Sequence, residues 1–169
     1  VINVSYLGHL IEAQLGDGRR FGVTIRYSHE QQALETAGGI KRALPWLGDE
    51  PFLVVNGDVF LPQGLPPLIS FSANDLAHLW LTDNPDHNPG GDFALEHGRL
   101  TLSSPKLTYT GISVLHPDLF QHLDHGAQPL APLLRQAIAE SKVSGEYWPN
   151  AWLDVGTPER LQQAGRMTS

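Results

Sequence analysis

The feature that most constrains the fold is a short apolar run ending in an acid, Phe52-Leu53-Val54-Val55-Asn56-Gly57-Asp58. Four successive apolar residues are typical of a strand buried on both faces, the kind found inside parallel sheets. Ligands of open α/β sheets bind at the carboxyl ends of such strands, and Asp58 follows that end. Gly57 has no side chain, so another backbone or a phosphate can come close. We therefore expect Asp58 to hold a metal ion at the edge of an α/β sheet.

The same residues allow a second interpretation. Asn56-Gly57 is a strong hairpin signal, and an acid at a strand end is often only a turn former. Against a hairpin, Pro62 follows soon and no alternating partner strand appears after Asp58. Asp154 is a second candidate ligand, because it closes the apolar pair Trp152-Leu153. Two carboxylates that reach one point can hold Mg²⁺ and leave positions free for phosphate oxygens and water.

Apolar periodicity along the chain predicts alternating strands and helices. Strands are expected at Val1 to Val4, Phe21 to Tyr27 and Ala77 to Thr82, with helices from about Leu7 and Leu34. This alternation implies βαβ units, and hence a mostly parallel sheet with helices on both faces. The pattern changes after a Pro- and Gly-rich loop over residues 83–91. Short segments on either side of His97-Gly98 then predict a small antiparallel hairpin.

Length and charge narrow the class of protein. With 169 residues, the chain is expected to form one domain over residues 1–169, incomplete at its N-terminus because it opens inside a strand. A net charge of −7 argues against a sequence-independent nucleic-acid binder. The absence of cysteine fits a cytoplasmic location, and no apolar run is long enough for a membrane span. His122 and His125 have metal-ligand spacing, but their polar segment indicates surface residues.

Four motifs in register resemble the sugar-1-phosphate nucleotidyltransferases, and together they cover nearly the whole chain. They are Leu34-Glu35-Thr36-Ala37-Gly38-Gly39, Asn56-Gly57-Asp58-Val59, Thr110-Gly111-Ile112-Ser113-Val114 and Trp152-Leu153-Asp154-Val155-Gly156-Thr157-Pro158. The resemblance implies a Rossmann-like sheet and an Mg²⁺ ion held by Asp58 and Asp154. It also implies two sets of substrate-binding residues. The nucleotide side comprises Glu35, Thr36, Gly38, Gly39 and Asn56, and the sugar side comprises Gly91, Asp92, Gly111 and Glu146.

The resemblance also implies a reaction. A sugar 1-phosphate attacks the α-phosphorus of UTP or another nucleoside triphosphate, and pyrophosphate leaves. Further likeness around Gly91-Asp92-Phe93 and Val143-Ser144-Gly145-Glu146 implies N-acetylmuramate 1-phosphate as the sugar substrate, in cell-wall sugar recycling. The alternatives are transfer to glucose, GlcNAc or mannose 1-phosphate, and a non-catalytic regulatory domain that binds sugar nucleotides.

One departure from the family pattern concerns the start of the chain. Family members open with a Gly-rich loop that contains a basic residue, and a lysine follows shortly after. The printed sequence has neither before its first predicted strand. Those groups bind the triphosphate, so we expect the 169-residue chain by itself to be inactive.

Overall fold

A computed structural model describes residues 1–67, 69 and 71–167. The chain forms two compact units, each made from two segments. The first comprises Val1–Glu50 with Pro117–Leu133, and the second comprises Pro51–His116 with the chain from Leu134 onward. Whether the two units fold as one domain stays a prediction, because compactness alone does not decide it.

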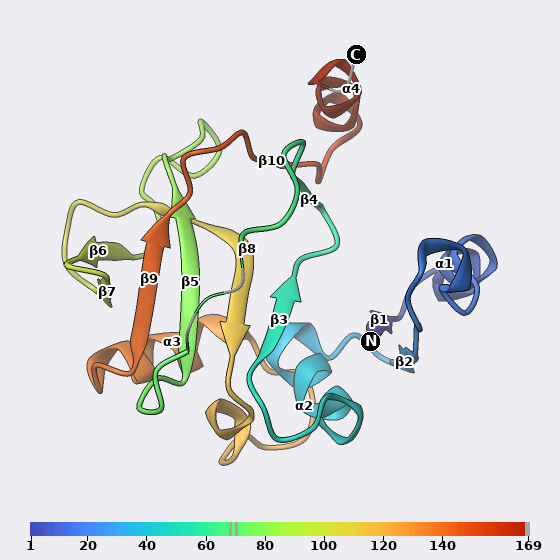
Figure 1. The fold of residues 1–169 in the computed structure, drawn as a ribbon, viewed down its shortest axis with the longest axis horizontal. Helices are drawn as coiled ribbons and strands as arrows, with labels where there is room; N and C mark the ends of the chain where they lie inside the picture. The colour runs from blue at the N-terminus through green and yellow to red at the C-terminus, as the bar shows by residue number, and fades with distance from the viewer. Residues whose placement is uncertain (68, 70, 168–169) are drawn as a thin grey trace. The chain divides into compact units, whose positions relative to one another are not determined.

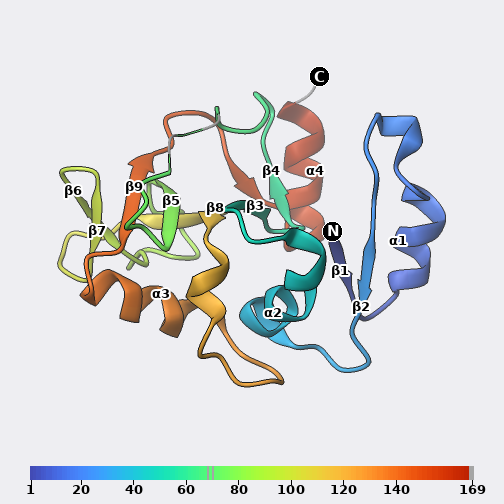
Figure 2. The same ribbon diagram turned by 60° about the horizontal axis from the view of Figure 1, so that its bottom comes forward.

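The first unit combines a short parallel ladder with helices. β1 (Ile2–Val4) pairs with β2 (Tyr27–His29), as the apolar opening of the chain predicts for its first strand. Figure 2 shows helix α1 beside this ladder, and Gly8 at the start of α1 lies against the side chain of Val4. The other elements of the unit are α1 (Gly8–Leu15), η1 (Arg19–Phe21), α2 (Glu35–Leu47) and η2 (Pro117–Phe120).

The strand predicted from Phe21 to Tyr27 was wrong. Gly18 and Gly22 have φ angles of 84° and 72°, which turn the chain tightly on either side of η1. The amide of Val23 then donates to the Gly18 carbonyl at 3.3 Å. Alternating apolar residues in this segment therefore belong to a turn, and the strand begins only at Tyr27.

The second unit is built on a sheet of six strands in the order β3-β8-β5-β9-β7-β6, counted over the described residues (Figure 1). The central strands β5 and β8 are buried on both faces, with Leu79, Leu81 and Ile112 fully buried. The strands are β3 (Phe52–Val55), β5 (Ala77–Thr82), β6 (Ala94–Glu96), β7 (Arg99–Thr101), β8 (Thr108–Leu115) and β9 (Val143–Tyr147).

The α/β class is confirmed, but the expectation of mostly parallel pairing was wrong. β3, β5 and β9 run in the same direction, as βαβ units require. β8 inserts between β3 and β5 and is antiparallel to both, so in this sheet only the β5–β9 pair is parallel among the described strands. The pattern of apolar runs does not reveal the direction of an inserted strand.

β3 differs from its prediction in burial. It lies at the edge of the sheet and pairs with β8, and Leu53 and Val55 are 43% and 38% exposed. The pattern buried on both faces belongs instead to β5, which lies between β8 and β9. The predicted hairpin is confirmed as β6 and β7, joined through His97 and Gly98 at φ angles of 52° and 78°.

Four further elements lie wholly or partly in the second unit. β4 (Val59–Phe60) and β10 (Leu153–Asp154) form a separate antiparallel pair, and α4 (Pro158–Met167) follows β10. Helix α3 (Leu130–Ala139) carries buried Leu134 and Ala137. None of the helices formed by the described residues has the length and apolar character that crossing a bilayer demands.

Candidate functional site

Asp58 and Asp154 lie at one pocket of about 300 Å³ on the second unit. Three carboxylates, two aromatic rings and several amide and hydroxyl groups face it. The lining residues are Asn56, Asp58, Val59, His87, Asn88, Asp92, Thr108, Tyr109, Thr110, Gly111, Trp152 and Asp154. Five residues predicted from the sequence therefore share this pocket, namely Asn56, Asp58, Asp92, Gly111 and Asp154.

The two acids are brought together by the short β4–β10 ladder. Asp154 is opposite Val59, and the amide of Val155 donates to the Asp58 carbonyl at 2.8 Å. Asp154 is therefore part of a two-residue antiparallel pair, and Asp58 directly precedes the other strand of that pair. Residues opposite each other in such a pair lie about 5 Å apart, so Asp154 lies close to the residue that follows Asp58, and both acids line one pocket.

The Asn56-Gly57 signal makes a turn but not the rival hairpin. The amide of Val59 donates to the Asn56 carbonyl at 3.2 Å, which closes a tight turn through Gly57 and Asp58. The strand after the turn, β4, pairs with β10 and not with β3. A Cβ added to Gly57 would meet nothing within 4 Å, which leaves the space beside Asp58 open.

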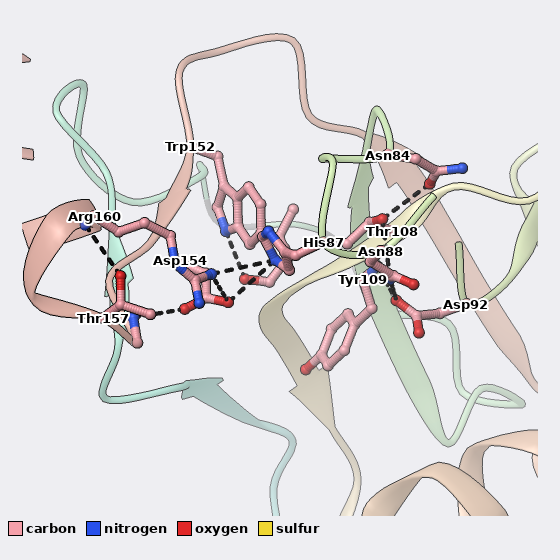
Figure 3. A network of polar contacts seen from close by, with 12 residues as sticks. Asn84, His87, Asn88, Asp92, Thr108, Tyr109, Trp152, Asp154, Thr157 and Arg160 are labelled. Atoms are coloured by element: carbon pink, nitrogen blue, oxygen red, sulfur yellow. Dashed lines mark hydrogen bonds and ion pairs between the residues drawn. The ribbon is translucent and has the colours of Figure 1, made fainter. Parts of the chain in front are cut away.

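The Asp154 carboxylate is held by groups on three sides (Figure 3). The amide of Gly156 donates to Oδ1 at 2.8 Å, and Arg160 Nη1 donates to Oδ2 at 2.8 Å. His87 Nε2 lies 3.4 Å from the same Oδ2 and 3.3 Å from Arg160 Nη1. Arg160 is in the first turns of α4, where the Thr157 hydroxyl accepts its backbone amide at 3.3 Å. The helix thus positions the guanidinium over the acid.

His87 can play either of two roles in this cluster. As a neutral imidazole with an unprotonated Nε2, it accepts a hydrogen bond from Arg160. With a proton on Nε2, it instead faces the Asp154 carboxylate as a donor. In both states the carboxylate, the guanidinium and the imidazole form one polar cluster at the mouth of the pocket.

Gly111 shapes the pocket wall. Its φ angle of 78° marks an irregularity in β8, where the register with β5 shifts. A Cβ at this position would lie 2.8 Å from Asn56 Nδ2, and the Gly111 carbonyl accepts the Asn56 amide at 2.9 Å. The absence of a side chain at Gly111 therefore makes room for the Asn56 side chain. Next to it, Trp152 Nε1 donates to the Thr110 carbonyl at 2.8 Å, which fixes the indole in the pocket wall.

A loop over residues 83–92 supplies the opposite wall. Asp92 Oδ2 accepts from the Tyr109 amide at 2.8 Å and from Asn88 Nδ2 at 3.1 Å. Asn88 also donates to the Thr108 hydroxyl at 3.2 Å, so the loop is tied to β8 (Figure 3). Gly91 is packed closely, because a Cβ there would lie 2.8 Å from the Lys106 carbonyl group. The predicted sugar-side residues Gly91 and Asp92 thus first of all hold this loop in place.

Glu146 is not among the described residues that line the pocket. It is exposed on β9, and its Oε1 lies 4.0 Å from Nε2 of the buried His78. Burial lowers the pKa of His78, and the nearby carboxylates of Glu146 and Asp75 oppose that shift. His78 Nδ1 lies 2.9 Å from the Ser144 hydroxyl, whereas Nε2 has no hydrogen-bond partner. The sugar-side role of Glu146 stays a prediction.

Tyr109 presents a neutral phenol to the site. Burial raises its pKa to about 12, and the hydrogen bond from its hydroxyl to Ser113 at 2.8 Å opposes the shift only in part. A phenol with such a pKa stays protonated at neutral pH. Tyr109 therefore supplies an aromatic surface to the pocket and no proton-transfer group.

The predicted nucleotide-side residues Glu35, Thr36, Gly38 and Gly39 lie at the start of α2 in the first unit. Two of the backbone N–H groups at this helix start are already paired, so they are not free for a ligand. The amides of Ala37 and Gly38 both donate to the Gln128 carbonyl, at 2.9 and 3.1 Å. Gly38 and Gly39 are buried against neighbouring atoms. A role for these four residues in binding the nucleotide stays a prediction.

Sequence reasoning missed part of the site. His87 and Asn88 were recognised only as loop residues, and Arg160 was not singled out. The signal for Arg160 is its position two residues beyond Pro158, which ends the motif that contains Asp154. His87 carries no local signal, because its partner Arg160 is 73 positions away in the chain.

The donor atoms of the pocket fit a hard divalent cation. Mg²⁺ prefers oxygen ligands and is bound in nucleotide enzymes by one or two carboxylates together with phosphates and water. Asp58 is exposed. Each oxygen of Asp154 accepts one close hydrogen bond, so each keeps a further lone pair with which it can bind a cation. Among the described residues no cluster of three or more metal-ligating side chains occurs, so any cation here would complete its shell with substrate or water.

Comparison with known proteins identifies the family. The sequence profile of the nucleotidyl transferase family matches residues 1–90, and the chain belongs to this family. An N-acetylmuramate alpha-1-phosphate uridylyltransferase of Neisseria meningitidis serogroup B is 44% identical over 97% of this chain and 75% of its own length. A protein of the same name from Caulobacter vibrioides is 28% identical over 94% of this chain and 73% of its own length.

The solved structures agree on the fold. The inositol-1-phosphate CTP transferase of T. maritima superposes with a TM-score of 0.76 at 18% identity. The superposition covers 99% of this chain and 75% of the other. The nucleotidyltransferase fold implied by the four motifs is therefore confirmed.

Proposed function

We propose that this chain carries the cation- and sugar-binding part of a uridylyltransferase that acts on N-acetylmuramate 1-phosphate. The observation that carries the proposal is the convergence of Asp58 and Asp154 on one pocket, beside Asn56 and Gly111. The 44% identity to the Neisseria uridylyltransferase over nearly the whole chain supports the choice of nucleotide and sugar. The reaction takes place between small molecules in the cytoplasm.

The proposed uridylyl transfer requires little proton transfer. The attacking oxygen of a sugar 1-phosphate is already an anion near neutral pH, so catalysis depends on bringing two polyanions together and holding them in line. Asp58 and Asp154 would hold the Mg²⁺ ion, which when bound neutralises charge on the phosphates. The amide of Val155 ties the start of the ladder to the Asp58 backbone, and the Asp154 carboxylate is held by Gly156 and Arg160.

The remaining lining residues orient the sugar. Asp92 uses Oδ2 for the loop, so Oδ1 is available to accept a hydrogen bond from a sugar hydroxyl. Tyr109 and Trp152 present aromatic faces that exclude water from the reacting groups. The Asn56 side chain, placed against Gly111, offers an amide to the nucleoside side.

The experiment is a pyrophosphate-release assay with purified protein, UTP and N-acetylmuramate 1-phosphate, with Mg²⁺ or EDTA. Glucose, GlcNAc and mannose 1-phosphates and the other nucleoside triphosphates are assayed separately as alternative substrates. We expect Mg²⁺-dependent release that is fastest with the N-acetylmuramate substrate. Faster release with another sugar phosphate would replace the sugar assignment, and release unaffected by EDTA would remove the metal assignment.

The assay needs two polypeptides. One is the 169-residue chain, and the other carries this chain behind the Gly-rich loop of the family. We expect transfer only from the second, because the loop supplies the groups that bind the triphosphate. Transfer by the 169-residue chain alone would contradict this expectation.

A further inference from the structure

The described lining of the pocket lacks the positive charge that a phosphate-carrying substrate requires. The described lining residues include three carboxylates, those of Asp58, Asp92 and Asp154, but neither lysine nor arginine. Both substrates of the proposed reaction carry phosphate groups, and phosphate is usually bound by charge-assisted hydrogen bonds from cationic side chains. The cationic groups that reach this pocket must therefore come from residues next to the lining.

Arg160 is such a residue, and the imidazole of His87 lies beside its guanidinium. The guanidinium of Arg160 lies directly behind the pocket-lining Asp154, and His87 lies both in the lining and within 3.3 Å of Arg160. Figure 3 shows the two side chains meeting at the Asp154 carboxylate. Arg160 comes from α4 and His87 from the loop over residues 83–92, so two separate elements bring these nitrogens to one point.

The guanidinium keeps donors to spare. Within the cluster only Nη1 makes close contacts, to Asp154 and to His87. Nη2 lies beside Gly156, where an added Cβ would lie 3.5 Å from Nη2 and 3.0 Å from Asp154 Oδ1. Since Gly156 is exposed, a ligand can approach both groups from solvent.

We propose that Arg160 and His87 bind a phosphate group of the substrate beside Asp154. The inference rests on the proposed function for its choice of ligand. A planar guanidinium matches two phosphate oxygens at once, and His87 adds a third donor when Nε2 carries a proton. Asp154 holds the guanidinium in place before the ligand arrives. The Arg160 and Asp154 side chains are 25% and 26% exposed, so the pair keeps some contact with solvent.

The test measures pyrophosphate binding to the 169-residue chain by titration calorimetry, in EDTA so that no divalent cation contributes. Arg160→Gln should weaken binding by at least about tenfold, and His87→Ala by about two- to fivefold. Arg166→Gln is the matched control, because Arg166 is exposed at the other end of the same helix. We expect the control to bind within twofold of the wild type.

Several outcomes would overturn the proposal. Wild-type protein that does not bind pyrophosphate, or Arg160→Gln that binds it like the wild type, would each do so. An equal loss in Arg166→Gln would also overturn it, because the effect would then come from overall charge. If Arg160→Gln does not fold, Arg160→Lys replaces it. Pyrophosphate binding that is at least about threefold weaker in Arg160→Lys, which lacks the planar guanidinium, supports the proposal. Wild-type affinity in this variant overturns it.

Failure of the proposed function gives a different result. A protein that binds pyrophosphate through Arg160 but transfers no nucleotide to any sugar phosphate keeps the phosphate site and loses the reaction. A protein that transfers uridylyl groups with pyrophosphate binding unchanged in Arg160→Gln keeps the reaction and loses this site.

Discussion

The two acids of the pocket lie in different surroundings. Asp58 is an exposed residue in a turn, with open space beside Gly57. Asp154 is about three-quarters buried and is held by the Gly156 amide, Arg160 and His87. The two acids therefore have different properties as ligands of a metal ion. Asp154 is oriented in advance by its neighbours, whereas Asp58 stays free to adjust to a cation and its phosphate ligands.

The largest expected effect tests what the two acids share. Asp58→Ala and Asp154→Ala should each slow uridylyl transfer by at least about a thousandfold in a polypeptide that is active, because each removes a charged ligand of the cation. Mn²⁺ binding, followed by electron paramagnetic resonance, should weaken in both. Asp49→Ala, an exposed acid in the first unit, is the control. Transfer within tenfold of the wild type in either pocket variant would remove that residue from the cation site.

The next effect separates the two acids by stability. Asp154→Asn should lower the free energy of unfolding by about 1 kcal/mol, because Arg160 loses a charged partner in a partly exposed pair. Asp58→Asn should change it by less than about 0.5 kcal/mol. Urea denaturation of both variants measures the difference. Equal losses would mean that Asp154 is no better held than Asp58.

A matched pair of glycines sharpens the same contrast. Gly57→Ala should raise the free energy of unfolding by about 0.5 kcal/mol, because it restricts the unfolded chain and meets nothing in the fold. Gly156→Ala should bring no such gain, because its methyl group would lie 3.0 Å from Asp154 Oδ1. Urea denaturation measures both. A gain of the same size at Gly156 would show that the carboxylate moves aside without cost.

The smallest effect arises away from both acids, at His78. Because burial lowers its folded pKa, the unfolded chain binds the proton more readily near pH 6, and stability falls as the pH drops below the ordinary histidine value of about 6.5. We expect a loss below about 1 kcal/mol between pH 7 and pH 5. His78→Asn keeps an acceptor for Ser144 and should flatten this part of the profile. An unchanged profile would assign the pH dependence to other groups.

The sequence located the two acids but not the way they meet. Asp58 and Asp154 stand out because each follows apolar residues and belongs to a motif of the family. The β4–β10 ladder was not foreseen, since strands of two residues are too short to show any periodicity. No sequence pattern therefore indicates that this ladder places Asp154 opposite the residue after Asp58.

The fold shows the same limit. Alternating strands and helices predicted the α/β class, and His97-Gly98 predicted the hairpin. An apolar run such as Phe52 to Val55 predicts a strand, but it does not show whether that strand has neighbours on both sides or on one side only. β3 therefore turned out to be an edge strand with Leu53 and Val55 partly exposed. His87 and Arg160 meet only through folding, so no local pattern marks them.

Trp152 gives the site an optical reporter. Its indole is fixed in the pocket wall by the hydrogen bond to the Thr110 carbonyl, and it remains partly open to the pocket. Trp80 and Trp148 are buried in the core of the second unit, and Trp46 lies in the first unit. A ligand that enters the pocket would alter the polarity around Trp152 directly. The intrinsic fluorescence of a variant with the other three tryptophans replaced by phenylalanine would then follow ligand binding without any added label.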